Sequence, residues 1–214
     1  MEARQVGARE ADVAPAPEPA VSGGWTPANP GPLGLAAFAL TTFVLSMINA
    51  HLVGPRGAAA VLPLAAIYGG IVQLLAGMWE FRTGNTFGAV AFSSYGAFWI
   101  GLYVILKLPA LAVTPQAVSL YLWGWSIFTV LMLVASLRTT GALAAVFLIL
   151  TITFFILAIG NASLVGTTNV TNGTIKLGGW LGIVTAAGAW YVAFAGVVAS
   201  TFGRDILPVF PLNR

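Results

Sequence analysis

Asn-Pro-Gly-Pro-Leu-Gly-Leu, residues 29–35, divides this 214-residue chain into two parts of opposite character. Before it lies a polar segment rich in Ala, Pro, Glu and Arg, and after it the sequence is almost continuously apolar. Asn is a preferred N-cap residue and Pro suits the first helical position, so Asn29 and Pro30 predict the start of a helix. The free N–H groups and positive dipole end of such a start also suit a small anion, although most capped helices bind no ligand.

The composition is that of an integral membrane protein. Hydrophobic residues make up 58% of the chain and charged residues only 7%, whereas soluble domains carry about 25% charged residues. The nine basic residues stand singly, so the net charge of +3 does not indicate nucleic acid binding. The sequence has no Cys, one His, and no HExxH, Ser/His/Asp or GxxxxGK[ST] motif. We therefore expect no enzyme, no cofactor and no metal.

The polar N-terminal segment, residues 1–28, contains four prolines and is predicted to be a disordered cytoplasmic tail, because it cannot bury enough apolar area to fold. Charged residues stand where the apolar region of a signal peptide would be, so we expect no cleaved signal. The predicted organisation is completed by one membrane domain, residues 29–208, and a short C-terminal tail, residues 209–214.

Six apolar runs follow the tail, and each is close to the roughly 20 residues that a spanning helix needs. They cover residues 32–52, 60–80, 86–107, 117–137, 142–161 and 179–202. The connections are short except for residues 163–179, which join the last two runs. The predicted fold class is therefore all-α, a polytopic membrane protein with six transmembrane helices.

Basic residues predict the orientation of these helices. The termini, the second loop and the fourth loop share one side and hold six Arg, whereas the other three loops hold three basic residues. The side with more Lys and Arg is normally cytoplasmic, so both termini are predicted to be cytoplasmic. Two Asn-X-Thr matches, beginning at Asn169 and Asn172, lie in a loop rich in Thr and Asn and are interpreted as chance.

Two of the predicted helices carry the same polar-edged stripe on one face. The stripes are Phe38, Thr42, Leu45 and Asn49 in the first run, and Leu150, Phe154, Leu157 and Asn161 in the fifth. Each has a bulky apolar residue near mid-membrane and an Asn about 16 Å further along the helix. Tyr95 stands near the middle of the third run, which has the same direction. An Asn side chain facing lipid is costly, so both Asn should face protein or a water-filled cavity.

Hydrogen bonding between helices explains one such Asn easily, but it explains less well why the odd-numbered helices share this pattern. Glu80 and Arg82, at the cytoplasmic end of the second run, are expected to pair with each other or with loop groups. The remaining interpretation is a pore or carrier for a small solute. Because no buried Arg or Lys is present, a monocarboxylate would bind weakly and pass quickly.

Residues 29–35 match a known signature, Asn-Pro-Ala-Pro-Leu-Gly-Leu, with Gly31 in place of the Ala. Residues 68–99, and the shorter stretches 158–161, 179–180 and 202–208, match further motifs in the same order. Over residues 29–208 the chain therefore resembles the acetate uptake transporter family, the succinate–acetate permease (YaaH-type) group.

This resemblance implies six helices per subunit, a homohexamer, and a separate pathway in each subunit for acetate and related short monocarboxylates, with succinate in some members. It implies that a hydrophobic constriction falls on Phe38, Tyr95 and Leu150, and that the size of Ala189 influences which acid passes. The other residues expected to bind substrate or line the pathway are Asn29, Thr42, Asn49, Gln73 and Asn161.

The resulting hypothesis is a low-affinity acetate transporter or channel in the plasma (inner) membrane. Proton symport and passive passage both stay open. One alternative is a channel or exporter for ammonium or another small neutral solute, and a second is a non-conducting membrane scaffold or sensor subunit.

Overall fold

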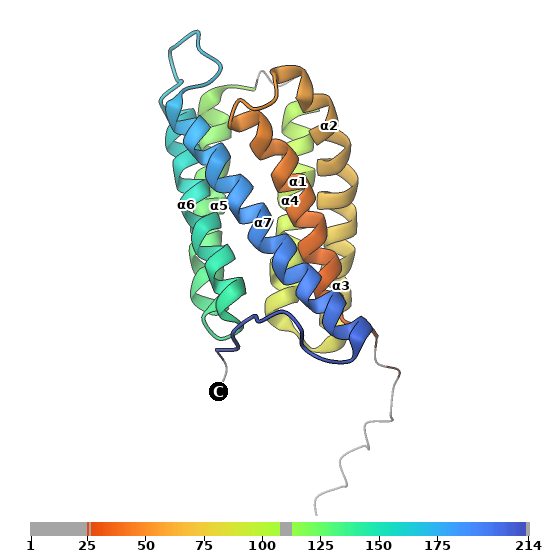
Figure 1. Ribbon diagram of the computed structural model, residues 1–214. Coiled ribbons are helices and arrows are strands. Elements are labelled where there is room, and N and C mark those ends of the chain that lie inside the picture. The colour runs from red at the N-terminus through yellow and green to blue at the C-terminus, as the bar shows by residue number, and fades with distance from the viewer. Residues whose placement is uncertain (1–24, 26, 108–112, 213–214) are drawn as a thin grey trace, which may run out of the picture.

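The computed structural model describes residues 25, 27–107 and 113–212 (Figure 1). The prediction of a disordered tail falls almost entirely on residues outside this part of the chain. Within the described residues, six helices are long and apolar enough to cross a membrane. The all-α fold class and the number of spanning helices are thus confirmed, and the chain is a multi-pass membrane protein.

The helices follow the six apolar runs closely. The second span is continuous from Ala58 to Thr83 and changes character along its length. The bounds are α1 Gly31–Asn49, η1 Pro55–Gly57, α2 Ala58–Pro63, η2 Leu64–Val72, α3 Gln73–Thr83, α4 Thr86–Lys107, α5 Pro115–Ser136, α6 Gly141–Ala162 and α7 Gly173–Phe202.

The middle of the second span, η2, is π-helical and follows Pro63, the last residue of α2. Glycines let this span approach its neighbours closely. A side chain at Gly69 would collide with Thr41 of α1, and one at Gly77 would collide with Ser93 of α4. Small residues are the usual means by which membrane helices pack tightly. The close approach turns one face of α3 toward the interior between α1 and α4.

The start of α1 differs from the prediction by one residue. Pro30, rather than Asn29, is the N-cap residue, and the helix begins at Gly31. Asn29 still caps the helix, because its Oδ1 accepts a hydrogen bond from the Gly31 N–H at 2.9 Å. The stretch that divides the sequence is therefore a capped helix start, as expected, with a shifted register.

The start of α7 differs more. The helix begins at Gly173, six residues before the predicted position, because Asn172 Oδ1 accepts a hydrogen bond from the Ile175 N–H at 2.9 Å. Because Lys176 interrupts the apolar run, hydropathy alone does not identify the first turns of this helix. Asn172, interpreted as part of a chance match, is thus the N-cap residue of the longest helix in the described chain.

A ladder of small residues on α7 packs within the subunit. A side chain at Gly179 would collide with the backbone of Ala50, and one at Gly182 would collide with Ser46. Because Ser46 belongs to α1 and Ala50 is its C-cap residue, α1 and α7 lie in direct contact.

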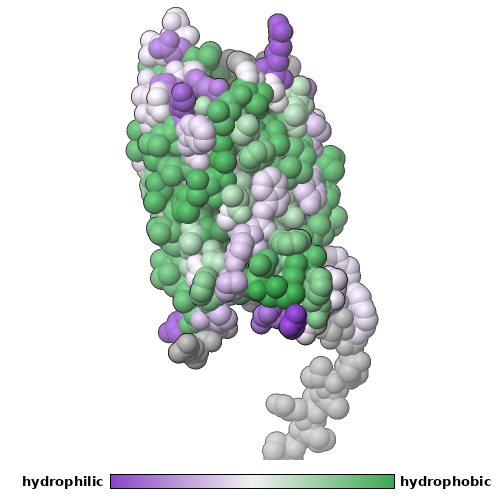
Figure 2. Space-filling view, in the orientation of Figure 1, coloured by the Kyte–Doolittle hydropathy of each residue, from purple (hydrophilic) through white to green (hydrophobic). Residues whose placement is uncertain are grey.

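Both described ends of the chain lie at the same end of the bundle, here called the terminal end (Figure 1). Helices α1, α4 and α6 begin there and run away from it. The space-filling view shows apolar residues over most of the height of the visible face, with polar residues concentrated toward its two ends (Figure 2). This distribution is typical of a chain that crosses a bilayer.

The C-terminal segment crosses the terminal end and pairs with the α5–α6 loop. The Gly141 N–H donates to the Phe210 carbonyl at 2.7 Å, and the Leu212 N–H donates to the Thr139 carbonyl at 2.9 Å. The segment 209–212, predicted as part of a tail, is held against the membrane domain by these bonds.

Candidate functional site

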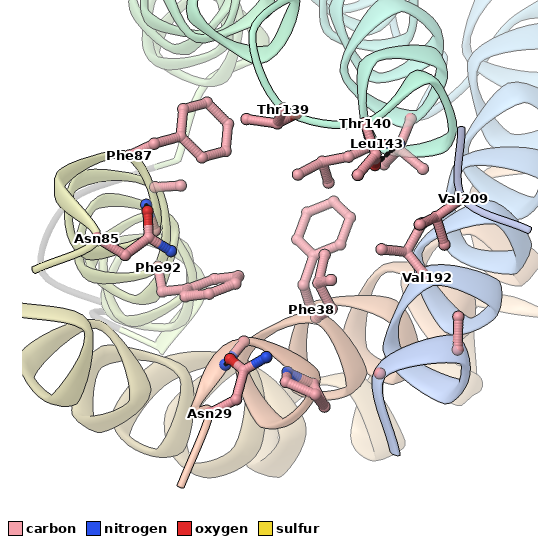
Figure 3. A pocket seen from close by; sticks show the side chains of 18 of the residues that line it. Asn29, Phe38, Asn85, Phe87, Phe92, Thr139, Thr140, Leu143, Val192 and Val209 are labelled. Atoms are coloured by element: carbon pink, nitrogen blue, oxygen red, sulfur yellow. Dashed lines mark hydrogen bonds between the residues drawn. The ribbon is translucent and has the colours of Figure 1, made fainter. Parts of the chain in front are cut away.

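A cavity of about 360 Å³ opens at the terminal end, between α1, α3, α4, α6 and α7 (Figure 3). It has room for on the order of ten waters at about 30 Å³ each. Polar residues surround its mouth, namely Asn29, Asn85, Thr139, Thr140 and Asp205. The cavity is thus large enough for a small organic solute with part of its hydration water.

The deep end of the cavity is closed by apolar side chains from three helices. On α1, α4 and α6 the lining residue farthest from the terminal end is Phe38, Tyr95 and Leu150 respectively. All three are buried, and the ring centroids of Phe38 and Tyr95 are 5.8 Å apart. In Figure 3 the Phe38 ring points from α1 across the cavity toward Thr140 and Leu143. The structure therefore gathers the three predicted constriction residues around one cavity.

These residues lie well inside the membrane-spanning part of the bundle. Phe38 is seven residues into α1, and Tyr95 and Leu150 are nine residues into α4 and α6. At 1.5 Å per residue the depths are about 10 and 14 Å. Since the hydrocarbon layer is about 30 Å thick, the cavity ends near its middle.

The position of the Tyr95 ring is fixed by its neighbours. Its hydroxyl lies 2.9 Å from Thr129 Oγ1. Because the Thr129 hydroxyl donates to the Trp125 carbonyl at 2.7 Å, the Tyr95 hydroxyl donates to Thr129. The ring also packs edge-on against Phe128, with centroids 5.5 Å apart. A side chain held on both its polar and apolar parts is suited to a fixed wall of a narrow passage.

Two polar side chains of α3 line the cavity wall. Gln73 and Glu80 are seven residues apart, two helical turns on one face, and each is only 1% exposed. One oxygen of each, Oε1, has no hydrogen-bond partner. Buried polar atoms without partners are uncommon in folded proteins, so this pair calls for a functional explanation.

Glu80 has a different environment from the one expected. It does not pair with Arg82, whose guanidinium donates to the Trp25 carbonyl at 3.2 Å. Its Oε2 accepts hydrogen bonds from Asn85 Nδ2 at 2.9 Å and from the Thr83 hydroxyl at 3.1 Å. The expected pairing with loop groups is thus confirmed, and the pairing with Arg82 is wrong.

Sequence reasoning did not place Glu80 in the pathway. The available signal was that it is the only acidic residue in the six apolar runs and lies seven residues after Gln73. The lining also includes Asp205, Leu207 and Val209 from the C-terminal segment. No periodicity marks those residues, because they belong to no helix.

No Lys, Arg or His lines the described cavity, and its charged residues are Glu80 and Asp205. A small anion would therefore find no fixed positive side chain in this wall. The favourable groups for a carboxylate are amides, hydroxyls, water and the N-terminal end of α1.

The other predicted residues divide into two groups. Asn29 and Gln73 line the cavity, whereas Thr42, Asn49, Asn161 and Ala189 are not part of its lining. Thr42 lies one turn beyond Phe38 and is buried, and its hydroxyl has no partner.

Of the remaining three, Asn49 and Asn161 lie on the far side of the constriction. Asn161 Nδ2 donates to the Leu157 carbonyl of its own helix at 2.8 Å. Ala189 is fully buried one turn from Val192, a lining residue, and Asn49 is half-buried at the end of α1. Their role in a pathway stays a prediction.

Known proteins with similar sequences cover nearly the whole chain. The family model described as GPR1/FUN34/yaaH family matches residues 14–214. Acetate permease A of Emericella nidulans is 44% identical over 195 residues, covering 85% of this chain and 65% of that protein. The succinate-acetate/proton symporter SatP of Escherichia coli strain K12 is 40% identical over 186 residues, covering 85% of this chain and 95% of that protein.

A solved structure is similar over the same region. The bacterial acetate channel SatP superposes with a TM-score of 0.77 at 39% sequence identity. The match covers 86% of this chain and 99% of the solved chain. The overall fold is therefore shared with a solved channel.

Proposed function

Because the chain belongs to the GPR1/FUN34/yaaH family, we propose that it is a membrane transporter or channel for acetate and related short monocarboxylates. The names of the two relatives, an acetate permease and a succinate-acetate/proton symporter, support this substrate class, as does the similar acetate channel. The proposed activity is transport, without chemical conversion of the acid.

The observation that carries the proposal is the way the cavity ends. A passage that narrows to Phe38, Tyr95 and Leu150 admits a solute by size, because only a small group can pass two aromatic rings and a leucine. The mouth beyond them is polar, with Asn29 at the start of α1 guiding the carboxylate. Without a fixed cation in the wall, binding is weak and release is fast.

The proposed assembly is a homohexamer in the plasma (inner) membrane, with a separate pathway in each subunit and both termini in the cytoplasm. The excess of basic residues on the side of the termini supports the orientation. The family resemblance supports the assembly. In this orientation the cavity is the cytoplasmic vestibule, and Thr42, Asn49 and Asn161 line the outer half of the pathway.

The direct test is influx of labelled acetate into vesicles that contain the purified protein, with protein-free vesicles as the background. We expect saturable influx that unlabelled acetate inhibits. Flux of ammonium without competition by acetate would favour the alternative solute. Absence of any flux would favour the scaffold or sensor, and either result would contradict the proposal.

A further inference from the structure

The geometry points to Glu80 as the proton-carrying group of this pathway, and we propose that it shares one proton with the carboxyl group of the substrate in the cavity. This inference rests on the proposed function, since it concerns the same cavity and the same class of acid. It assigns a role to the one buried carboxyl group among the described lining residues.

The two carboxyl oxygens of Glu80 have different surroundings. Oε2 is held by Asn85 and Thr83, which fixes the direction of the carboxyl group. Oε1 has no partner, although the side chain is 1% exposed and lines the cavity. Oε1 therefore has unused hydrogen-bonding capacity beside the cavity, and a solute contacts it once the side chains that cover it move.

Opposing effects act on the charge of Glu80. A buried carboxylate with no cation beside it is costly, and binding a proton removes that cost. The hydrogen bonds from Asn85 and Thr83 favour the ionised form instead. The N-terminal end of α1 acts in the same sense, because a Cβ at Gly31 would lie 3.4 Å from Glu80 Oε1. A group balanced in this way can exchange a proton as its surroundings change.

A second unpaired acceptor, Gln73, lies about 10 Å deeper along α3. Its unpaired amide oxygen can accept a hydrogen bond from the O–H of a neutral carboxylic acid. An ionised carboxylate has no hydrogen to donate, so its oxygen and the Gln73 amide oxygen would be two acceptors facing each other without a hydrogen bond. The deep wall is thus better matched to the neutral acid than to the anion.

The proposed step moves one proton and breaks no other bond. A substrate carboxylate reaches the protonated Glu80, the O–H proton passes from Oε1 to the substrate oxygen, and Glu80 becomes a carboxylate. The neutral acid then passes Gln73 toward Phe38, Tyr95 and Leu150. Water at the open mouth returns a proton to Glu80, and the same steps run in reverse for movement in the other direction.

Few other titratable groups lie on the surrounding helices near Glu80. Helix α1 has none, Tyr68 of η2 is not part of the cavity lining, and α4 contributes Tyr95 at the cavity floor. On α3 itself Arg82 is bonded to the Trp25 carbonyl. Asp205 lines the mouth but is exposed, so it differs from Glu80 in burial while sharing the cavity.

The test uses Glu80→Gln, which keeps the shape of the side chain and cannot carry a proton. Vesicles containing the full chain are loaded with a pH-sensitive dye, and labelled acetate and proton movement are measured together. In the wild type we expect protons to enter with acetate. In Glu80→Gln, acetate influx and the proton entry that accompanies it should both fall about tenfold or more, because the substrate loses its proton donor. The same variant should lose the pH dependence of influx.

Asp205→Asn is the matched control, because it removes the other carboxylate of the described cavity at an exposed site. It should keep the wild-type pH profile of influx. Asn85→Ser is a second probe that does not depend on replacing Glu80. Serine can still cap α4, but it cannot reach Glu80, so the ionised form loses one donor. The midpoint of the pH profile should move upward by about one pH unit.

The outcomes separate this inference from the proposed function. Wild-type acetate influx without accompanying protons would overturn the role of Glu80 and leave the transport of acetate intact. Unchanged acetate influx and proton entry in Glu80→Gln, or an unchanged pH midpoint in Asn85→Ser, would do the same. Absence of acetate flux in the wild type would overturn both.

Discussion

Polar side chains on the two sides of the Phe38–Tyr95–Leu150 constriction differ in their hydrogen bonding. On the terminal side, Gln73 and Glu80 keep an unpaired oxygen in the wall of an open cavity. On the far side, Asn161 satisfies its amide within its own helix.

The difference shows that a polar residue in an apolar run can serve either the fold or the solute. Burial of the Asn161 amide in an apolar helix costs little free energy, because a backbone carbonyl four residues earlier accepts its hydrogen bond. Gln73 and Glu80 leave bonding capacity unused, and such capacity is retained where a ligand or water supplies the missing partner. Accordingly, variants on the terminal side should alter flux more strongly than variants beyond the constriction.

The largest effect is expected at the constriction itself. Leu150→Ala, or separately Phe38→Ala, widens the end of the cavity and should raise lactate influx relative to acetate by about tenfold, since a pocket discriminates by roughly this factor per carbon group. Leu148→Ala is the matched control, because this leucine of the same helix is half exposed on the outside of the bundle. Unchanged selectivity in labelled-acid influx would remove the two residues from the gate.

A smaller effect is expected at Gln73. Gln73→Met keeps the length of the side chain and removes the unpaired amide oxygen, so acetate flux should fall by about fivefold, the equivalent of one hydrogen bond. The same change should stabilise the fold by about 1–3 kcal/mol, because it removes a buried polar group without a partner. Thermal unfolding in detergent and vesicle influx measure the two effects. A variant with lower flux and lower stability would indicate a structural role.

A still smaller effect is expected beyond the constriction. Asn49→Leu and Asn161→Leu should each slow acetate influx by about two- to threefold, because an amide in a membrane helix contributes about 0.6 kcal/mol on average. A smaller loss of acetate influx than in Gln73→Met would support the difference between the two sides of the constriction. Normal influx in both variants would place the outer pathway elsewhere.

The smallest effect is expected at Gly31. Gly31→Ala adds a methyl group 3.0 Å from Asn29 Oδ1 and 3.4 Å from Glu80 Oε1. The Asn29 side chain is exposed and can move, so the change in acetate flux should be below about twofold, and the gain in helix stability below about 1 kcal/mol. Loss of transport would show that the space beside Glu80 is essential.

The spans were predictable because they depend on local properties. An apolar run of about 20 residues can only be satisfied as a membrane helix, so all six helices were identified. Helix starts were less predictable, because they depend on single caps. Asn172 begins α7 six residues early, inside a segment whose Lys176 suggested a loop.

The site was predictable in part. The helical spacing of the stripes and the family resemblance together predicted Phe38, Tyr95 and Leu150 as constriction residues. The structure places all three at one end of the cavity. Glu80 was assigned to the interface, because a charged residue at the end of a run normally faces water. Its burial arises from contacts with α1 and α4, and the contribution of Val209 arises from pairing with the α5–α6 loop. Such tertiary contacts cannot be predicted from the periodicity of apolar residues in the sequence.

The central claim is that Phe38, Tyr95 and Leu150 separate the terminal cavity from Thr42. The chain contains no Cys, so Thr42→Cys can be labelled without background. The measurement is the rate at which a small, impermeant thiol reagent, added on the side of the termini, modifies this site with and without Leu150→Ala. We expect slow modification with Leu150 present and a several-fold faster reaction in Leu150→Ala, because the smaller side chain opens the constriction. Equal rates in the two backgrounds would contradict it.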